Sequence, residues 1–267
     1  MTEMEPATQS TMQPAIQSIM QPVLKSLPEG IIFLDEALAV VVKTAGEVCE
    51  AGSPQSLALR MAPLIEQALG HKLERCECVH RLDQPVSGLC VLALTEKSVV
   101  QLSKIFASNS VEKTYCAITE RKKSAQGEML SEISSDWKNL ECVMTFDRCK
   151  KKARILSEQE VQRGGKSAGK KALLRYKLVG QGERYDFLLV ELFTGRTHQI
   201  RCQLAGEGRP IKGDLKYGAK RSEKAGGIRL HAWKLVLPHP VTGKNLSFTC
   251  LPPQMDALWQ ACTSFLC

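Results

Sequence analysis

Short hydrophobic stretches follow one another along most of the chain, and only a few are long enough to form a helix. Alternating or unbroken apolar positions predict strands, because a strand buries every second residue, or all of its residues when both faces are covered. The predicted strands cover residues 30–35, 37–42, 89–94, 111–118, 172–178 and 184–193. Many short strands with few long helices between them are compatible with an α+β fold.

Apolar residues spaced three or four positions apart predict three helices. The first covers 56–70 and ends at Gly70, the second covers 96–108, and the third covers 254–265. We expect the first helix to pack against the sheet, since it precedes the unbroken apolar run at 89–94.

Two segments interrupt this pattern. Residues 1–28 contain four prolines and are rich in Gln, Met, Ser and Thr, so we expect a flexible arm, with a docking peptide as the alternative. Residues 119–171 are rich in Lys, Arg and Gly, and we interpret them as a basic, insertion-like segment with little regular structure. Its part 148–171 has nine Lys or Arg and two Glu, which indicates either contact with phosphates or a solvated loop. Residues 29–267 are expected to form a single domain.

The composition favours a globular protein with an anionic partner. With 267 residues, 43% of them hydrophobic, the chain can bury a sizeable core, and its formal net charge of +8 favours nucleic acid as a partner. Eleven cysteines without a Cys-x-x-Cys pair indicate neither a disulfide framework nor a zinc site. We expect reduced, mostly buried cysteines, with one or two free thiols near Cys262 and Cys267. No apolar run approaches the roughly 18 residues of a membrane span, so we expect a cytoplasmic protein, with a nuclear or organellar location left open.

Reactive side chains stand directly before an unbroken apolar run in the stretch 80–95, which begins His-Arg-Leu-Asp-Gln-Pro-Val-Ser-Gly. Pro85 stiffens the turn, and Gly88 permits a sharp entry into the strand. Asp83 is thereby a carboxylate on a stiff turn at the mouth of a buried strand, where it can act as a nucleophile or base. The alternative is that Asp83 only caps the turn.

A second polar cluster, Gly-Arg-Thr-His-Gln-Ile-Arg at 195–201, opens an apolar helix or turn at 200–204. A helix N-terminus capped by Thr197 is the simplest explanation. Such a cap alone does not require two arginines and a histidine, so the cluster is a candidate site.

The stretch 80–95 resembles the active-site motif of the RluA-type pseudouridine synthases over sixteen consecutive positions. The Lys-x-Tyr-x-Ala pattern at 113–117 is similar to the second motif of that family, and the cluster at 195–201 to the third. The resemblance extends from about residue 30 to about residue 253. It is weaker at Thr44, where the family usually has proline, and this predicts a looser turn.

The resemblance implies a pseudouridine synthase fold: an α+β catalytic domain whose long, mostly antiparallel mixed sheet is divided by a central substrate cleft. It also implies the isomerisation of uridine to pseudouridine in structured RNA, either transfer or ribosomal RNA, without a cofactor or a metal. We therefore expect RNA as the partner, no membrane association and a monomeric protein.

The resemblance further assigns roles to residues of this sequence. Asp83 is implied as the catalytic residue, Arg201 as its ion-pair partner, and Tyr115 as the residue that lies against the uracil ring. Arg81 is our candidate for filling the space that an extruded nucleotide leaves. The remaining substrate-binding candidates are His80, Arg196, His198 and Gln199.

Two other classes of protein fit these residues less well. A non-catalytic RNA-binding protein or RNA chaperone with the same fold would not need Asp83 and Arg201 together. A nucleic-acid hydrolase would use paired carboxylates or His and Cys metal clusters, which the sequence lacks. We expect His231 to be a hydrogen-bonded core histidine and His239 a turn residue.

Overall fold

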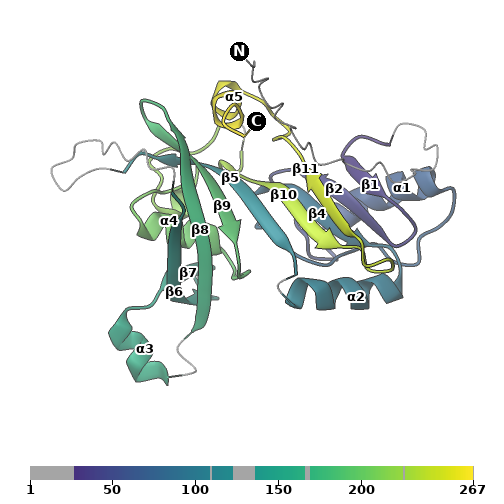
Figure 1. Cartoon of the computed structure of the whole chain (residues 1–267), viewed down its shortest axis with the longest axis horizontal. Coiled ribbons are helices and arrows are strands. Elements are labelled where there is room, and N and C mark those ends of the chain that lie inside the picture. Colours follow the sequence, from purple (N-terminus) through teal and green to yellow (C-terminus); the bar gives the residue numbers. More distant parts are fainter. Residues whose placement is uncertain (1–26, 109, 123–135, 166–168, 225, 267) are drawn as a thin grey trace, which may run out of the picture.

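The structure is a computed structural model that describes residues 27–108, 110–122, 136–165, 169–224 and 226–266 (Figure 1). All the strands in these ranges belong to one eleven-stranded sheet. They are β1 Ile31–Leu34, β2 Leu38–Lys43, β3 Glu77–Cys78, β4 Ser87–Ala93, β5 Glu112–Glu120, β6 Lys138–Asp147, β7 Lys152–Ile155, β8 Lys170–Gln181, β9 Tyr185–Leu192, β10 Leu230–Pro238 and β11 Asn245–Thr249. The arm predicted for residues 1–28 lies outside the described residues except for its last two.

The sheet is mixed but mostly antiparallel. Its strand order is β1-β2-β4-β10-β5-β9-β8-β6-β7, with β11 paired to β10 and β3 paired to β4. Within the described strands, the pairing of β10 with β4 is the parallel one. Figure 1 shows β1, β2, β4, β10 and β11 in one half and β6 to β9 in the other, with β5 running between them. The predicted fold class is confirmed.

The helices are few and short. They are α1 Leu57–Leu69, α2 Glu96–Ala107, α3 Glu158–Gly164, α4 Gln199–Gly206 and α5 Ala257–Thr263, with a 3-10 turn, η2, at Leu215–Tyr217. The helices predicted at 56–70 and 96–108 are confirmed as α1 and α2. The third predicted helix is shorter than expected, because it begins only after Asp256, whose carboxylate caps it by accepting the backbone N–H of Trp259 at 3.0 Å.

Strand β4 is buried along its whole length because a helix covers each of its faces. All seven residues of β4 are buried. Cys90 and Leu92 pack in one hydrophobic cluster with Ile65 of α1. Leu89 and the other alternate residues pack in a second cluster with Leu102 of α2. This double coverage explains the unbroken apolar run, since a strand buried on both faces loses its alternation.

The expectation of little regular structure over 119–171 is wrong for its second half. Strands β6 and β7 form an antiparallel pair, β6 also pairs with β8, and α3 follows β7. Strand β6 lies near the edge of the sheet and is exposed on both faces at its start, where Lys138, Asn139 and Glu141 are all exposed. Polar residues on both faces of a strand near an edge remove the alternation of apolar and polar positions, so the pattern does not indicate a strand. Residues 123–135 and 166–168 of this segment are outside the described part.

The described cysteines are mostly buried, as expected from the composition, and Cys267 lies outside the described residues. Ten cysteines are described, all as free thiols, and six of them are buried: Cys49, Cys90, Cys116, Cys202, Cys250 and Cys262. No helix in the described ranges has the length and apolar character needed to cross a membrane.

Candidate active site

The turn that carries Asp83 is built around a buried lysine. Val86 donates its backbone N–H to the carbonyl of Asp83 at 2.9 Å and closes the turn. The ammonium group of Lys43, at the end of β2, donates to the carbonyls of Val86 at 2.7 Å, Gln84 at 3.1 Å and Asp83 at 3.3 Å. It also donates to the carbonyl of Thr44 at 3.1 Å. Burial lowers the pKa of Lys43, but the four carbonyl dipoles satisfy its charge and hold the turn in one conformation.

The turn after Lys43 is not loose, contrary to the expectation from Thr44. Both the backbone N–H and the hydroxyl of Thr44 donate to the carboxylate of Glu47, at 2.7 and 2.9 Å. Gly46 donates its N–H to the carbonyl of Gln84 at 2.8 Å. These hydrogen bonds supply the rigidity that a proline would otherwise give, and they attach this turn to the Asp83 turn.

Strand β4 leaves the Asp83 turn in close contact with β10. Gly88 has a φ of +128°, and a Cβ at this position would lie 2.4 Å from the backbone nitrogen of Ala232, so only glycine fits. Beside it, Ser87 Oγ lies 2.8 Å from Nδ1 of His231, and Nε2 of His231 lies 3.0 Å from the carbonyl oxygen of Cys250. Burial lowers the pKa of His231 to about 4. The prediction that His231 is a hydrogen-bonded core histidine is confirmed.

Arg201 of α4 contacts the Asp83 carboxylate directly. Its Nη1 donates to Oδ2 of Asp83 at 3.2 Å. Its Nε and Nη2 donate to the two carboxylate oxygens of Asp214 at 2.6 and 2.9 Å. Although burial lowers the pKa of Arg201, hydrogen bonds and charge pairing with these two carboxylates raise it overall. Sequence reasoning missed Asp214, whose signal was a charged residue directly after Gly213.

His198 lies near the same carboxylate oxygen of Asp83 as Arg201 does. Its Nε2 is 4.0 Å from Oδ2 of Asp83, and its Nδ1 is 2.9 Å from the hydroxyl of Tyr217. Burial lowers the pKa of His198, and the charge of Asp83 opposes this shift. His198 occupies the N-cap position of α4 in a left-handed conformation, with φ 56°, and makes no side-chain cap. The interpretation of Thr197 as the helix cap is therefore wrong.

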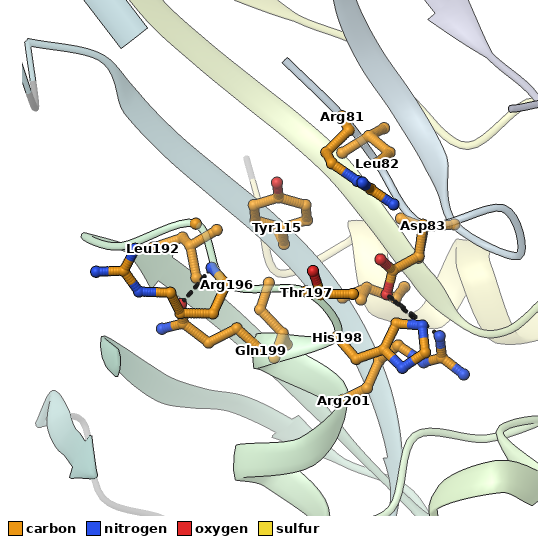
Figure 2. A pocket seen from close by; sticks show the side chains of 14 residues that line it. Arg81, Leu82, Asp83, Tyr115, Leu192, Arg196, Thr197, His198, Gln199 and Arg201 are labelled. Atoms are coloured by element: carbon orange, nitrogen blue, oxygen red, sulfur yellow. Dashed lines mark hydrogen bonds and ion pairs between the residues drawn. The ribbon is translucent and has the colours of Figure 1, made fainter. Parts of the chain in front are cut away.

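Asp83 faces a small cavity of about 70 Å³. Figure 2 shows Asp83 and His198 on one side of this cavity, Arg196 and Leu192 on the other, and Tyr115 of β5 between them. The lining residues are Arg81, Leu82, Asp83, Val86, Tyr115, Leu192, Gly195, Arg196, Thr197, His198, Gln199, Ile200, Arg201 and Leu230. The ring of Tyr115 is largely buried, which raises the pKa of its hydroxyl. The side chain of Asp83 is 15% exposed, so it can be reached from this cavity.

A larger cavity of about 820 Å³ continues from the first. The two share the lining residues Arg81, Tyr115, Leu192, Gly195 and Arg196. Together they form the central cleft that was expected in the sheet, and the cleft is large enough to admit a nucleotide and its neighbours.

The side chain of Gln199 stabilises the loop before α4 through hydrogen bonds. The side-chain oxygen of Gln199 accepts from Thr194 Oγ1 at 2.8 Å and from the N–H of Arg196 at 3.0 Å. Its amide nitrogen donates to the carbonyl of Leu173 at 3.2 Å. Arg196 in turn donates through Nε to the carbonyl of Lys171 at 2.9 Å. Both predicted binding residues thus line the cavity, and both also tie the loop to β8.

The two remaining predicted residues differ in their placement. Arg81 lines both cavities, has a side chain that is 61% exposed, and pairs with Glu50 at 2.8 Å. His80 lines the larger cavity but not the small cavity around Asp83. Its Nε2 accepts the N–H of Val91 at 3.0 Å, and its ring stacks on Phe106 at 4.6 Å between centroids. Burial lowers the pKa of His80 to about 4, so its imidazole is a neutral backbone acceptor near pH 7.

A carboxylate held by a buried arginine, with an aromatic ring beside it in a cleft, is an arrangement suited to nucleophilic or acid–base chemistry on a planar substrate. The described residues contain no group of three or more His, Cys, Asp or Glu side chains arranged to hold a metal ion.

The arrangement of elements is shared with solved pseudouridylate synthases. Human RNA pseudouridylate synthase domain containing 4 superimposes with a TM-score of 0.63 at 21% identity, over 90% of this chain and 94% of that chain. Human RNA pseudouridylate synthase domain containing 1 gives a TM-score of 0.60 at 19% identity, over 92% and 98% of the two chains. The fold is therefore of the pseudouridylate synthase class.

Sequence comparison identifies the family. The family model described as RNA pseudouridylate synthase matches residues 37–206. The ribosomal large subunit pseudouridine synthase C of Rickettsia bellii is 33% identical over 225 residues, which are 82% of this chain and 67% of that protein. The ribosomal large subunit pseudouridine synthase D of Zymomonas mobilis is 29% identical over 243 residues, 85% of this chain and 70% of that protein. The chain belongs to the RNA pseudouridylate synthase family, in its RluA type, and is an isomerase that acts on RNA.

Proposed function

We propose that this protein converts specific uridines of structured RNA to pseudouridine, with Asp83 as the reacting carboxylate. The observation that carries the proposal is the Asp83–Arg201 pair, 3.2 Å between Oδ2 and Nη1, at the wall of a cavity that also contains Tyr115. Relatives are named for the large ribosomal subunit in Zymomonas mobilis and for tRNA in Pectobacterium carotovorum. These names support ribosomal or transfer RNA as the substrate class.

The reaction replaces the bond between C1′ of the sugar and a nitrogen of uracil by a bond between C1′ and a carbon of uracil. The bond from C1′ to N1 of uracil breaks, the base turns within the pocket, and C1′ is joined to C5 instead. The proton on C5 is lost and N1 gains a proton, so nothing is oxidised or consumed. Asp83 can serve by adding to C1′ or by removing a proton from the sugar, and its placement on a rigid turn suits both routes.

Arg201 acts in this proposal by positioning Asp83. Because Asp214 holds two of its nitrogens, Arg201 is fixed before it meets the Asp83 carboxylate. A fixed guanidinium presents one donor to Oδ2 of Asp83 and leaves the other carboxylate oxygen to face the cavity. His198, at 4.0 Å, adds a second restraint on the same carboxylate.

Tyr115 and Arg81 are assigned to the base. The ring of Tyr115 is positioned to stack on the uracil, an interaction of roughly 1–3 kcal/mol for a base on an aromatic side chain. Extruding the uridine from a helical stack costs a few kcal/mol, and a side chain that enters the vacated space offsets part of it. Arg81 suits this role because it lies at the rim of the cleft, where an exposed ion pair with Glu50 holds it weakly.

Residues 29–267 are proposed to work as one catalytic domain, which the single sheet running through the described strands supports. A monomer and a cytoplasmic location stay predictions. Within the site, Arg196, His198 and Gln199 are proposed to shape the cleft wall against which the RNA binds. His80 lines the larger cavity, and it is proposed to shape that part of the wall, where its ring accepts from Val91 and stacks on Phe106.

The test is release of tritium from RNA labelled at C5 of uridine. The protein is expected to release tritium from ribosomal or transfer RNA transcribed without modification, and mapping of the product identifies the uridine. Binding of RNA without any release from either class would contradict the proposal and favour a non-catalytic RNA-binding protein.

A further inference from the structure

A third cavity, of about 580 Å³, lies at the end of β5 that is remote from Asp83. Tyr115 faces the active site, and Glu120 lines this cavity five residues further along the strand, about 17 Å away at the usual rise of about 3.3 Å per residue. We call this cavity the basic groove. Its lining cations are Arg121, Lys122, Arg184, Lys212, Lys220 and Arg221, against the single acid Glu120.

Much of this positive charge is uncompensated. Lys212 is paired with Glu223, and Arg121 lies 3.8 Å from Asp186. Arg184, Lys220 and Arg221 are exposed, and the described part of the chain places no carboxylate within 4.0 Å of their charged groups. Cations that remain unpaired around a concave surface attract a polyanion from solution.

The walls of the basic groove are held by backbone hydrogen bonds. Glu120 donates its N–H to the carbonyl of Pro210 at 2.9 Å, and Arg121 donates to the carbonyl of Arg184 at 3.2 Å. The carboxylate of Glu120 accepts the N–H of Lys220 at 2.8 Å. The end of β5, the β8–β9 turn and the segment after α4 therefore form one preformed concavity, so binding there does not require ordering the backbone.

The same segment that lines the basic groove also reaches the active site. Lys212 and Lys220 line the groove, and between them Asp214 binds Arg201 and Tyr217 contacts His198. The cavity beside Arg81 carries less positive charge, because Glu50 and Glu77 offset two of its three Lys or Arg residues, which are Arg81, Lys113 and Arg196. An RNA backbone leaving the uridine pocket is thus favoured in the direction of the groove.

We propose that the basic groove binds the phosphodiester backbone of the substrate RNA outside the uridine pocket. This inference rests on the proposed function and adds a second point of attachment to it. Arg184, Lys220 and Arg221 act on affinity and on the orientation of the RNA, because phosphate contacts position a nucleic acid without reading its sequence.

The test compares two triple variants of the full chain. In the groove variant, Arg184→Gln, Lys220→Gln and Arg221→Gln remove three exposed cations. In the control variant, Lys97→Gln, Lys104→Gln and Lys244→Gln remove the same charge from α2 and the β10–β11 turn. Figure 1 shows α2 beside the start of β5, whereas the groove lies at its end. Net charge is therefore matched and only its position differs.

Binding of labelled oligouridylate is measured over a range of salt concentrations. Removing three cation–phosphate interactions is expected to lower the slope of log affinity against log salt by about 2, at roughly 0.7 for each phosphate of a single strand. With this difference in slope, the ratio of parent affinity to groove-variant affinity changes on the order of a hundredfold for each tenfold decrease in salt concentration. In the tritium assay the groove variant should show a higher KM and an unchanged kcat. The control variant should keep the slope and the affinity of the parent.

Two further arms identify the ligand. A short oligouridylate that fills only the uridine pocket should bind the groove variant and the parent equally, since it cannot reach the groove. Inorganic phosphate should compete with long RNA only as far as its ionic strength predicts, and stronger competition would show a site for the free anion instead.

An unchanged salt slope in the groove variant, or an equal loss of affinity in the control variant, would overturn the proposal. The binding measurement does not depend on turnover. Absence of isomerase activity would therefore contradict the proposed function without deciding whether the basic groove binds RNA.

Discussion

The guanidinium of Arg201 and the carboxylate of Asp83, 118 positions apart in the sequence, lie 3.2 Å apart between Nη1 and Oδ2. Arg201 reaches Asp83 with only one of its nitrogens, because the other two are engaged by Asp214. The arginine is therefore oriented by a residue that does not line the cavity, and this defines how the reacting carboxylate is presented.

Replacing Asp83 by Asn is expected to abolish isomerisation while the fold and RNA binding are kept. The substitution is nearly isosteric and removes only the charge and nucleophilicity of the carboxylate. The loss in rate should exceed about a hundredfold, or roughly 2.7 kcal/mol, in the tritium-release assay. An Asn variant with more than about a hundredth of the parent rate would show that Asp83 is not the reacting group.

Arg201→Lys is expected to lose most of the activity, as Arg201→Ala should. An ammonium group is a point charge and cannot bind Asp214 through two parallel hydrogen bonds while also donating to Asp83. The matched control is Arg154→Lys on β7, which should keep the parent rate because Arg154 forms an exposed ion pair with Glu160 of α3. A fully active Arg201→Lys protein would reduce the role of Arg201 to general positive charge.

Lys43→Met is expected to destabilise the fold and to lower activity. The side chains are similar in length, but methionine leaves the carbonyls around Asp83 without their shared donor. A cost of about 3 kcal/mol for this loss would lower the melting temperature by roughly 10 °C in a chain of this size. Lys72→Met serves as the control, because Lys72 is an exposed partner of Glu66. If the Lys43→Met protein melted at the same temperature as the parent, the carbonyls would not depend on Lys43.

The stability of the protein is expected to fall as pH decreases from about 6.5 to about 4. Burial lowers the pKa of both His80 and His231 to about 4, from the usual 6.5. Between these values the unfolded chain takes up a proton at each position and the folded chain does not, so acid favours unfolding. The effect is at most about 1.4 kcal/mol per pH unit for each histidine.

Urea unfolding at about pH 7 and about pH 5 measures this dependence. His231→Gln should show a weaker dependence than the parent over this range. His71→Gln, at an exposed histidine whose pKa is raised by a backbone hydrogen bond at Lys72 and by Glu36, should not weaken it. Equal slopes in the parent and His231→Gln would contradict the assignment to His231.

Lys150→Gln combined with Lys151→Gln is expected to weaken RNA binding and to lower its salt slope by about 0.7 for each cation–phosphate interaction that is removed. Both lysines are exposed on the turn between β6 and β7. Lys152 is left unchanged, because its ammonium lies 5.2 Å from the centroid of the Tyr217 ring, next to the active site. An unchanged slope would identify this turn as a solvated surface.

Local patterns in the sequence were sufficient to locate most elements and the central residues. The unbroken run at 89–94 placed β4, because both faces of that strand are buried. Helical spacing placed α1 and α2, and Gly70, with a φ of +79°, ends α1 as expected. Asp83, Tyr115 and Arg201 could be selected as candidates because their motifs are contiguous in the chain.

Local sequence patterns led to wrong predictions at two places, the β6–β7 segment and the turn at Thr44. The segment of β6 and β7 was predicted to be a basic loop, because β6 has exposed residues on both faces and β7 has only four residues, two of them Lys152 and Arg154. Thr44 predicts a looser turn, but its hydrogen bonds to Glu47 supply rigidity that no local rule predicts.

The geometry of the active site and of the basic groove depends on contacts between segments that are distant in the sequence. Lys43 donates to the backbone carbonyl of Asp83, 40 positions away in the sequence. Asp214, 13 positions after Arg201, orients the guanidinium of Arg201. The basic groove likewise combines the end of β5, the β8–β9 turn and the segment after α4. Propensity and periodicity act between near neighbours in the chain, whereas the geometry of a site depends on which segments the folded sheet brings together.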